Sequence, residues 1–120
     1  MTRALAAGSA VPRDDPHRPA RASGLDCVHH AHTRLQPPLL LATHRAVNAF
    51  AALSWLIACS CHIADQLDAE PRRQVRQRML KPALQDELLH DLQESCFVTI
   101  EIADPETLFE LTIRSRGVAA

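Results

Sequence analysis

Hydrophobic positions dominate residues 39–68, where the longest run without a charged residue extends from Ala46 to Ala64. At 100° per residue, the apolar and polar positions of this stretch separate onto two sides of a helix. The apolar side holds Ala46, Ala49, Phe50, Leu53, Leu56, Ile57, Ala64 and Leu67, and the polar stripe holds His44, Asn48, Ala51, Trp55, Cys59, His62 and Gln66. The pattern predicts one amphipathic helix over residues 39–68, whose polar stripe contacts solvent or receives another chain.

Two shorter helices are predicted next, over residues 71–81 and 83–95. Pro71 suits the first turn of a helix, whereas Pro82 separates the two helices, because proline inside a helix removes a hydrogen bond and disfavours helical geometry before it. The apolar positions one turn apart are Val75 and Met79 in the first helix and Leu84, Leu88 and Leu92 in the second.

The hydrophobic period changes to two after residue 95. Apolar residues alternate with polar ones over residues 96–102 and 108–114, and the loop between them contains Pro105. This pattern predicts a β-hairpin. A helix over residues 104–114 is the alternative, because Asp104 and Pro105 also suit a helix start.

Residues 1–38 hold five of the eight prolines and two of the three glycines, without hydrophobic periodicity. We therefore expect a disordered tail there, with a targeting leader or an upstream extension from a misassigned start as alternatives. Pro37 and Pro38 mark its end, and residues 39–120 form the single predicted domain. The predicted fold class is α+β, mainly α, with a small all-α domain as the alternative.

The charges are unevenly distributed along the chain. Residues 82–120 carry eight acidic groups and two arginines, whereas residues 39–81 carry six basic and three acidic groups. This asymmetry favours pairing of the two parts, within one copy or between two. The four cysteines lack the spacing of a disulfide scaffold, which favours a reducing, cytoplasmic location.

Cys59-Ser60-Cys61-His62 is a candidate metal motif. On a helix Cys59 and His62 share a face, but Cys61 projects about 200° away from Cys59. A zinc site needs four converging ligands, so a metal at Cys59 and His62 is only a weak alternative and we expect no cofactor. The second Cys/His tract, residues 27–32, lies in the predicted tail, where adventitious metal binding is the expected behaviour.

A basic patch lies on the second predicted helix. It comprises Arg72, Arg73, Arg76, Arg78 and Lys81. Such a patch can contact phosphates, so a regulator that touches nucleic acid through residues 72–81 is an alternative function. Solvation, or pairing with acidic residues of the next helix (Asp86, Glu87, Asp91 and Glu94), is the simpler interpretation.

Leu56-Ile57-Ala58-Cys59 fits the small-residue pattern that precedes a lipid-modified cysteine. A lipoprotein anchored at Cys59 is a further alternative, provided that translation starts later than Met1. A membrane-spanning helix is excluded, because the run from Ala46 to Ala64 carries a polar stripe.

The sequence contains no motif for a catalytic nucleophile, a phosphate loop or paired carboxylates, so we expect no enzymatic activity. A lone hairpin is marginally stable in water and needs further packing. We therefore predict a small, soluble, non-catalytic interaction or structural protein that self-associates. The expected partner is a protein or a second copy; nucleic acid, membrane and small-molecule substrates are not expected.

Overall fold

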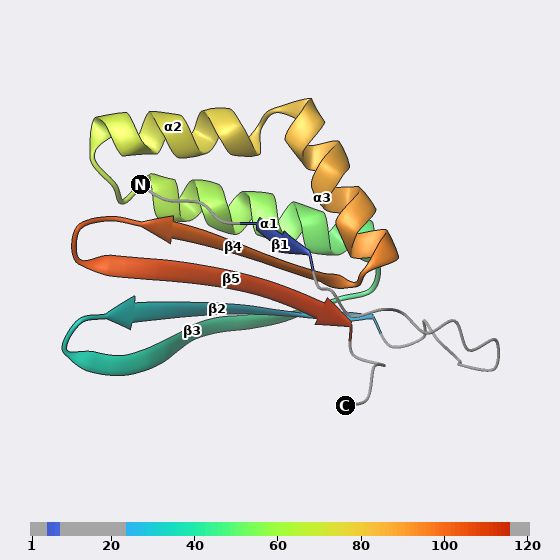
Figure 1. Ribbon diagram of the computed structural model, residues 1–120, viewed down its shortest axis with the longest axis horizontal. Helices are drawn as coiled ribbons and strands as arrows, with labels where there is room; N and C mark the ends of the chain where they lie inside the picture. The colour runs from blue at the N-terminus through green and yellow to red at the C-terminus, as the bar shows by residue number, and fades with distance from the viewer. Residues whose placement is uncertain (1–4, 8–23, 116–120) are drawn as a thin grey trace.

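The computed structural model describes residues 5–7 and 24–115 of the 120-residue chain. Three helices and five strands follow one another in this part of the chain (Figure 1). In chain order they are β1 (Leu5–Ala7), β2 (Leu25–Thr33), β3 (Gln36–Ala46), α1 (Ala49–Ala64), α2 (Ala69–Met79), α3 (Pro82–Glu94), β4 (Phe97–Ala103) and β5 (Thr107–Ser115).

The strands form one antiparallel sheet in the order β1-β4-β5-β2-β3. Two hairpins, β2–β3 and β4–β5, are joined through pairing of β2 with β5, which places Cys27 opposite Ile113. The centre of the sheet therefore pairs the early strand β2 with the last strand, β5. β3 is the outermost strand on one side (Figure 1).

The core lies between one face of the sheet and the helices. Every second residue of β4 is buried, and the helices α1 and α3 contact the sheet. The buried apolar residues of the sheet are Leu25, Cys27, Ala31, Ala46, Val98, Ile100, Ile102, Leu111 and Ile113. This alternation is the pattern of an antiparallel sheet that packs on a core with one face only.

Each helix places a row of buried residues on this core. In α1 the row is Ala52, Leu56, Ser60, Ile63 and Ala64; in α2 it is Val75 and Met79; in α3 it is Leu84, Leu88 and Leu92. Pro82 occupies the start of α3, where its missing N–H has no helical partner to lose. α2 and α3 lie within two residues of the predicted intervals 71–81 and 83–95.

The prediction of a mainly helical fold is wrong, because the five strands hold about as many residues as the three helices. Residues 5–7 and 25–38 were assigned to the disordered tail, but they form β1, β2, the turn after β2 and the start of β3. The long helix was expected to begin at residue 39, whereas residues 39–46 pair with β2 and α1 begins at Ala49. The tail prediction for residues 1–4 and 8–23 lies outside the described residues.

The C-terminal hairpin forms within one residue of the predicted strands 96–102 and 108–114, as one part of the larger sheet. The Asp104 carboxylate accepts hydrogen bonds from the backbone N–H groups of Glu106 and Thr107, at 2.8 and 2.7 Å. These bonds fix a turn, as Asp side chains commonly do. The helical alternative for residues 104–114 is therefore wrong.

Candidate interaction surface

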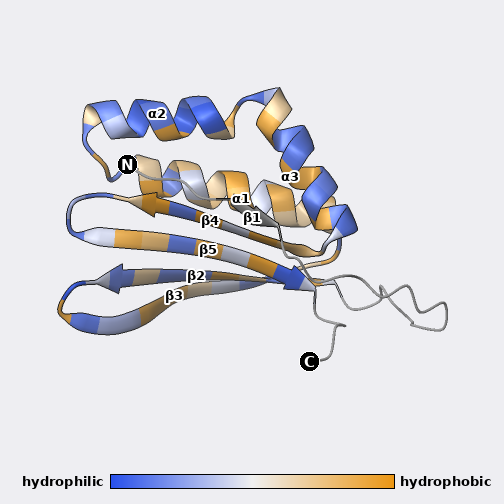
Figure 2. Ribbon diagram, viewed as in Figure 1, coloured by the Kyte–Doolittle hydropathy of each residue, from blue (hydrophilic) through white to orange (hydrophobic). Residues whose placement is uncertain are grey.

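The outermost strand, β3, is exposed along almost its whole length. Residues 36–45 are all exposed, and only Ala46 is buried. Three consecutive leucines lie in its middle: Leu39 is 48% exposed, Leu40 59% and Leu41 49%. We call residues 36–46, with these leucines at their centre, the β3 edge. Figure 2 shows the strand with a hydrophobic middle segment along the border of the sheet.

The β3 edge is apolar on both faces of the sheet. Leu39 pairs with the buried Ala31 of β2, so it lies on the side of the helices, whereas Leu40 pairs with His30 and lies on the opposite face. Leu41 has no direct partner, because the register shifts by one residue between the pairs His29–Ala42 and His30–Leu40. An edge strand with leucines on both faces resembles a central strand in composition.

Further exposed hydrophobic residues lie at the two ends of β3. Leu35, in the turn before β3, is 92% exposed, and Val47 and Phe50 are exposed just after it. Of the large hydrophobic side chains that are exposed in the described part of the chain, Leu80 alone lies elsewhere. The exposed apolar surface is thus concentrated along one border of the molecule.

The predicted interaction stripe is only partly one surface. His44 belongs to β3 rather than to the helix, and Asn48 is the N-cap of α1, where its side chain accepts the Ala51 N–H at 2.9 Å. The His44 ring stacks on Trp55, with ring centroids 6.3 Å apart and planes at 3°. His44 therefore reaches Trp55 because β3 packs against α1, and not because the two residues share a helix face.

The predicted orientation of the long helix is confirmed in part, since Leu56 and Ala64 of its apolar side are buried. Phe50, assigned to the apolar side, is exposed, whereas Ser60 is buried, and Trp55 and Cys59 of the supposed polar stripe are half-buried against the core. α1 is apolar around most of its circumference, so the sequence pattern defines the direction of its buried face poorly. His62 is the exposed member of the stripe within α1.

The cysteines lie in buried or half-buried positions of the described chain. Burial raises the pKa of the Cys27 thiol to about 11, and burial also raises the pKa of Cys59. A thiol with a raised pKa is a poor ligand and a poor nucleophile, because the thiolate is the reactive form. Within residues 5–7 and 24–115 no three His, Cys, Asp or Glu side chains are placed to hold a metal, so Cys59 and His62 lack further ligands.

The histidines of residues 27–32 project to both faces of the sheet, because they occupy a strand. His29 lies beside Phe109, with ring centroids 5.9 Å apart, and burial lowers its pKa. On the other face, His32 Nε2 lies 3.0 Å from a carboxylate oxygen of Glu110. The tract therefore does not converge on one ion.

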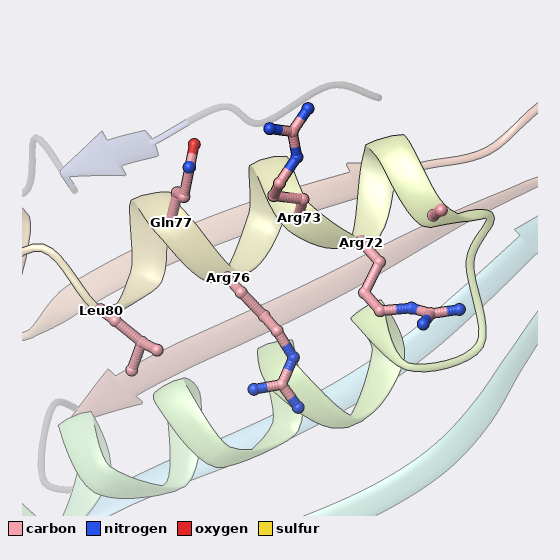
Figure 3. A pocket seen from close by; sticks show the side chains of 6 residues that line it. Arg72, Arg73, Arg76, Gln77 and Leu80 are labelled. Carbon is pink, nitrogen blue, oxygen red and sulfur yellow. The ribbon is translucent and has the colours of Figure 1, made fainter.

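The basic patch lies on α2, beside a shallow groove of about 500 Å³ (Figure 3). Arg72 donates to the Leu67 carbonyl at 3.1 Å, Arg73 pairs with Glu70, and Arg76 donates to Asp65 at 2.8 Å. The Arg76 hydrogen bond lowers the pKa of the Asp65 carboxyl. Three of the five cations thus already have partners within one copy. Their partners are Asp65, Glu70 and a backbone carbonyl, and not the acidic residues of α3 that the sequence suggested. Arg78 and Lys81 are exposed.

The lipid-anchor alternative requires a new N-terminus at Cys59, in the middle of α1. Processing there would remove β2 and β3, and with them the buried Leu25 and Cys27. That form of the protein would therefore need a fold other than the one described. No described helix is long and apolar enough to cross a membrane.

Comparison of the chain with protein-family models, curated proteins and solved structures yields no match. The geometry of the β3 edge is therefore the basis for the functional interpretation.

Proposed function

We propose that this chain is a small, non-catalytic protein-interaction protein that associates through the β3 edge and acts in the cytoplasm. The observation that supports this proposal is the outermost strand, exposed on both faces and carrying leucines on each. Exposed edge strands offer unpaired N–H and C=O groups to another chain, and natural proteins usually protect them with charges. The middle of β3 carries hydrophobic residues instead.

Association would bury these leucines. Covering the exposed half of one leucine side chain contributes about 1 kcal/mol, so three leucines from each copy supply a sizeable share of the free energy of a micromolar complex. The backbone hydrogen bonds of an added strand contribute both affinity and orientation.

The paired arginines of α2 weaken the nucleic-acid alternative. A protein that binds DNA or RNA uses free cations to displace counterions from phosphates. Arg72, Arg73 and Arg76 would first have to leave the partners that they have within the chain.

Sedimentation velocity of the full chain between about 1 and 200 μM tests the proposal, in the concentration range where weak complexes form. We expect a complex that the substitution Leu40→Lys abolishes, because it replaces an apolar contact at the centre of the strand with a charge, the residue type by which natural edge strands avoid pairing. Leu80→Lys is the matched control, since Leu80 is 52% exposed and lies outside the β3 edge.

Self-association that survives Leu40→Lys unchanged would contradict the assignment to the β3 edge. A folded monomer at every concentration, together with lysate capture that is identical for the wild type and Leu40→Lys, would overturn the proposed function. Circular dichroism of both variants confirms that each one is folded.

A further inference from the structure

We infer that the occupant of the β3 edge is a second copy of this chain, whose β3 pairs antiparallel with the first about a twofold axis. This inference rests on the proposed function and specifies its partner. The two sheets then form one continuous sheet, with the two β3 strands at its centre. Both copies use the same residues, as in the closed twofold dimers that are the commonest assemblies.

The backbone limits where this pairing takes place. Pro37 and Pro38 have no N–H to donate, so the first part of β3 is a poor template for another strand. Residues 39–46 contain no proline and are paired on their inner side with β2. An added strand therefore has its most favourable partner groups from Leu39 onward.

Charge favours the antiparallel direction. Arg45 is the one charged side chain in β3, and its Nε lies 3.8 Å from an Asp26 carboxylate oxygen on β2, with both side chains exposed. A parallel in-register pair would place the two Arg45 side chains about 5 Å apart. An antiparallel pair with its axis between Leu40 and Leu41 separates them by nine residue steps, or about 30 Å.

The exposed hydrophobic residues are self-complementary in this register. Leu40 lies opposite Leu41 of the second copy, and Leu39 lies opposite Ala42, which shares its face of the sheet. Leu35, before β3, comes next to the Ala46–Val47 segment of the second copy, which follows the same strand. In this register Pro37 and Pro38 lie opposite His44 and Thr43, so the backbone pairing is centred on residues 39–42 and the apolar contacts at Leu35 and Val47 flank it.

The exposed area is sufficient for a stable dimer. The exposed leucines of the edge, together with Val47 and Phe50, present on the order of 600 Å² of apolar surface, where a standard interface buries roughly 800 Å² per partner. The backbone of the paired strands adds to this area. A short peptide strand would cover the backbone but leave the outlying Leu35 and Phe50 exposed.

The test is nuclear magnetic resonance on an equimolar mixture of isotope-labelled and unlabelled full chain, combined with sedimentation velocity. We expect a dimer, with backbone pairing between copies confined to residues 39–42 near the axis and side-chain contacts that extend to Leu35 and Val47. Leu40→Lys should weaken dimerisation at least roughly 30-fold, since it removes the apolar contact with Leu41 of the second copy and brings two like charges together near the axis, whereas Leu80→Lys should leave the dissociation constant unchanged.

The other possible outcomes distinguish failure of the strand pairing from failure of self-association. A dimer with its contacts elsewhere would overturn the strand pairing and leave the proposal of self-association standing. Growth beyond a dimer would overturn the twofold closure. A monomer at about 200 μM, roughly the upper limit for a weak specific complex, would overturn the inference. In that case, capture of a different protein by the wild type but not by Leu40→Lys would retain only the interaction function.

Discussion

Gly24 precedes β2 with a backbone φ of +81°, in the left-handed region that favours glycine. A Cβ at this position would overlap the carbonyl oxygen of Ala46, the last residue of β3. Glycine here lets the start of β2 approach the end of β3 closely, and so contributes to the position of the β3 edge.

We therefore expect Gly24→Ala to lower the free energy of unfolding by about 2–3 kcal/mol, from backbone strain and the overlap with β3. Urea denaturation measures the change. Arg34→Ala, in the exposed turn between β2 and β3, is the control and should shift stability by less than about 0.5 kcal/mol. Equal effects of the two substitutions would contradict the role of Gly24.

Cys27 provides a prediction about pH. Burial raises its pKa from 9.0 to about 11, so the folded protein favours the protonated thiol. The stability that this raised pKa contributes is present below pH 9. It is lost as the pH rises from 9 through 11, because the Cys27 thiol of the unfolded chain releases its proton at a lower pH than that of the folded chain. The loss over this interval should reach about 2 kcal/mol.

Urea denaturation between pH 8 and 11 tests this directly, and the chain contains no tyrosine to titrate in the same interval. Cys27→Ala should be less stable at pH 8, because it leaves a small cavity, but should show a shallower decline above pH 9. Parallel stability curves for the wild type and Cys27→Ala would show that the thiol is not the titrating group.

At the scale of elements, local periodicity located α2, α3 and the C-terminal strands closely, because their signals lie within short windows. It missed the hairpin of β2 and β3. In β2 the buried positions Leu25 and Cys27 alternate with half-buried ones, but the flanking prolines and histidines suggested a tail. β3 has no alternation to detect, since both of its faces are exposed.

The candidate site was only partly predictable for the same reason. Trp55 and His44 were assigned to one helix stripe, and they do lie together, but through stacking between a strand and a helix. The leucines of the β3 edge were assigned to a helix. Their exposure follows from the pairing of β2 with β5, which are more than seventy residues apart and whose register no local pattern specifies.

Asn48 lies between the end of β3 and the start of α1. Its extended backbone and the hydrogen bond that its side chain accepts from the Ala51 N–H define the N-cap of α1. Asn48→Ala should lower the free energy of unfolding by about 1 kcal/mol, because a backbone donor loses its partner. Asn48→Asp should preserve stability, since it keeps the acceptor and adds a favourable negative charge at the helix start.

Thermal or urea unfolding of both variants measures this difference. The contrast is informative because α1 has no acidic residue in its first turn to compensate for the lost cap. Equal destabilisation by alanine and aspartate would show that the Asn48 hydrogen bond is unimportant for α1.

At the scale of the whole molecule, the sheet has two different borders. β1 and β3 are the two edge strands and each has a partner on its inner side only, but β1 has three residues whereas β3 has eleven. The helices cover one face of the sheet and leave β3 exposed (Figure 1). The most hydrophobic exposed surface is therefore also the surface with free strand-pairing groups, which is the combination that strand addition requires.

If two copies pair through β3, association and folding are linked, and the thermal midpoint must rise with protein concentration. A tenfold increase in concentration should raise the midpoint of the wild type by about 3 °C, given the unfolding entropy of a domain of this size. Leu40→Lys should unfold at a midpoint independent of concentration, because its dimer is lost, whereas Leu80→Lys should follow the wild type. Scanning calorimetry at several concentrations measures all three. A wild-type midpoint that stays constant over a hundredfold range would contradict the coupling of folding to β3 pairing.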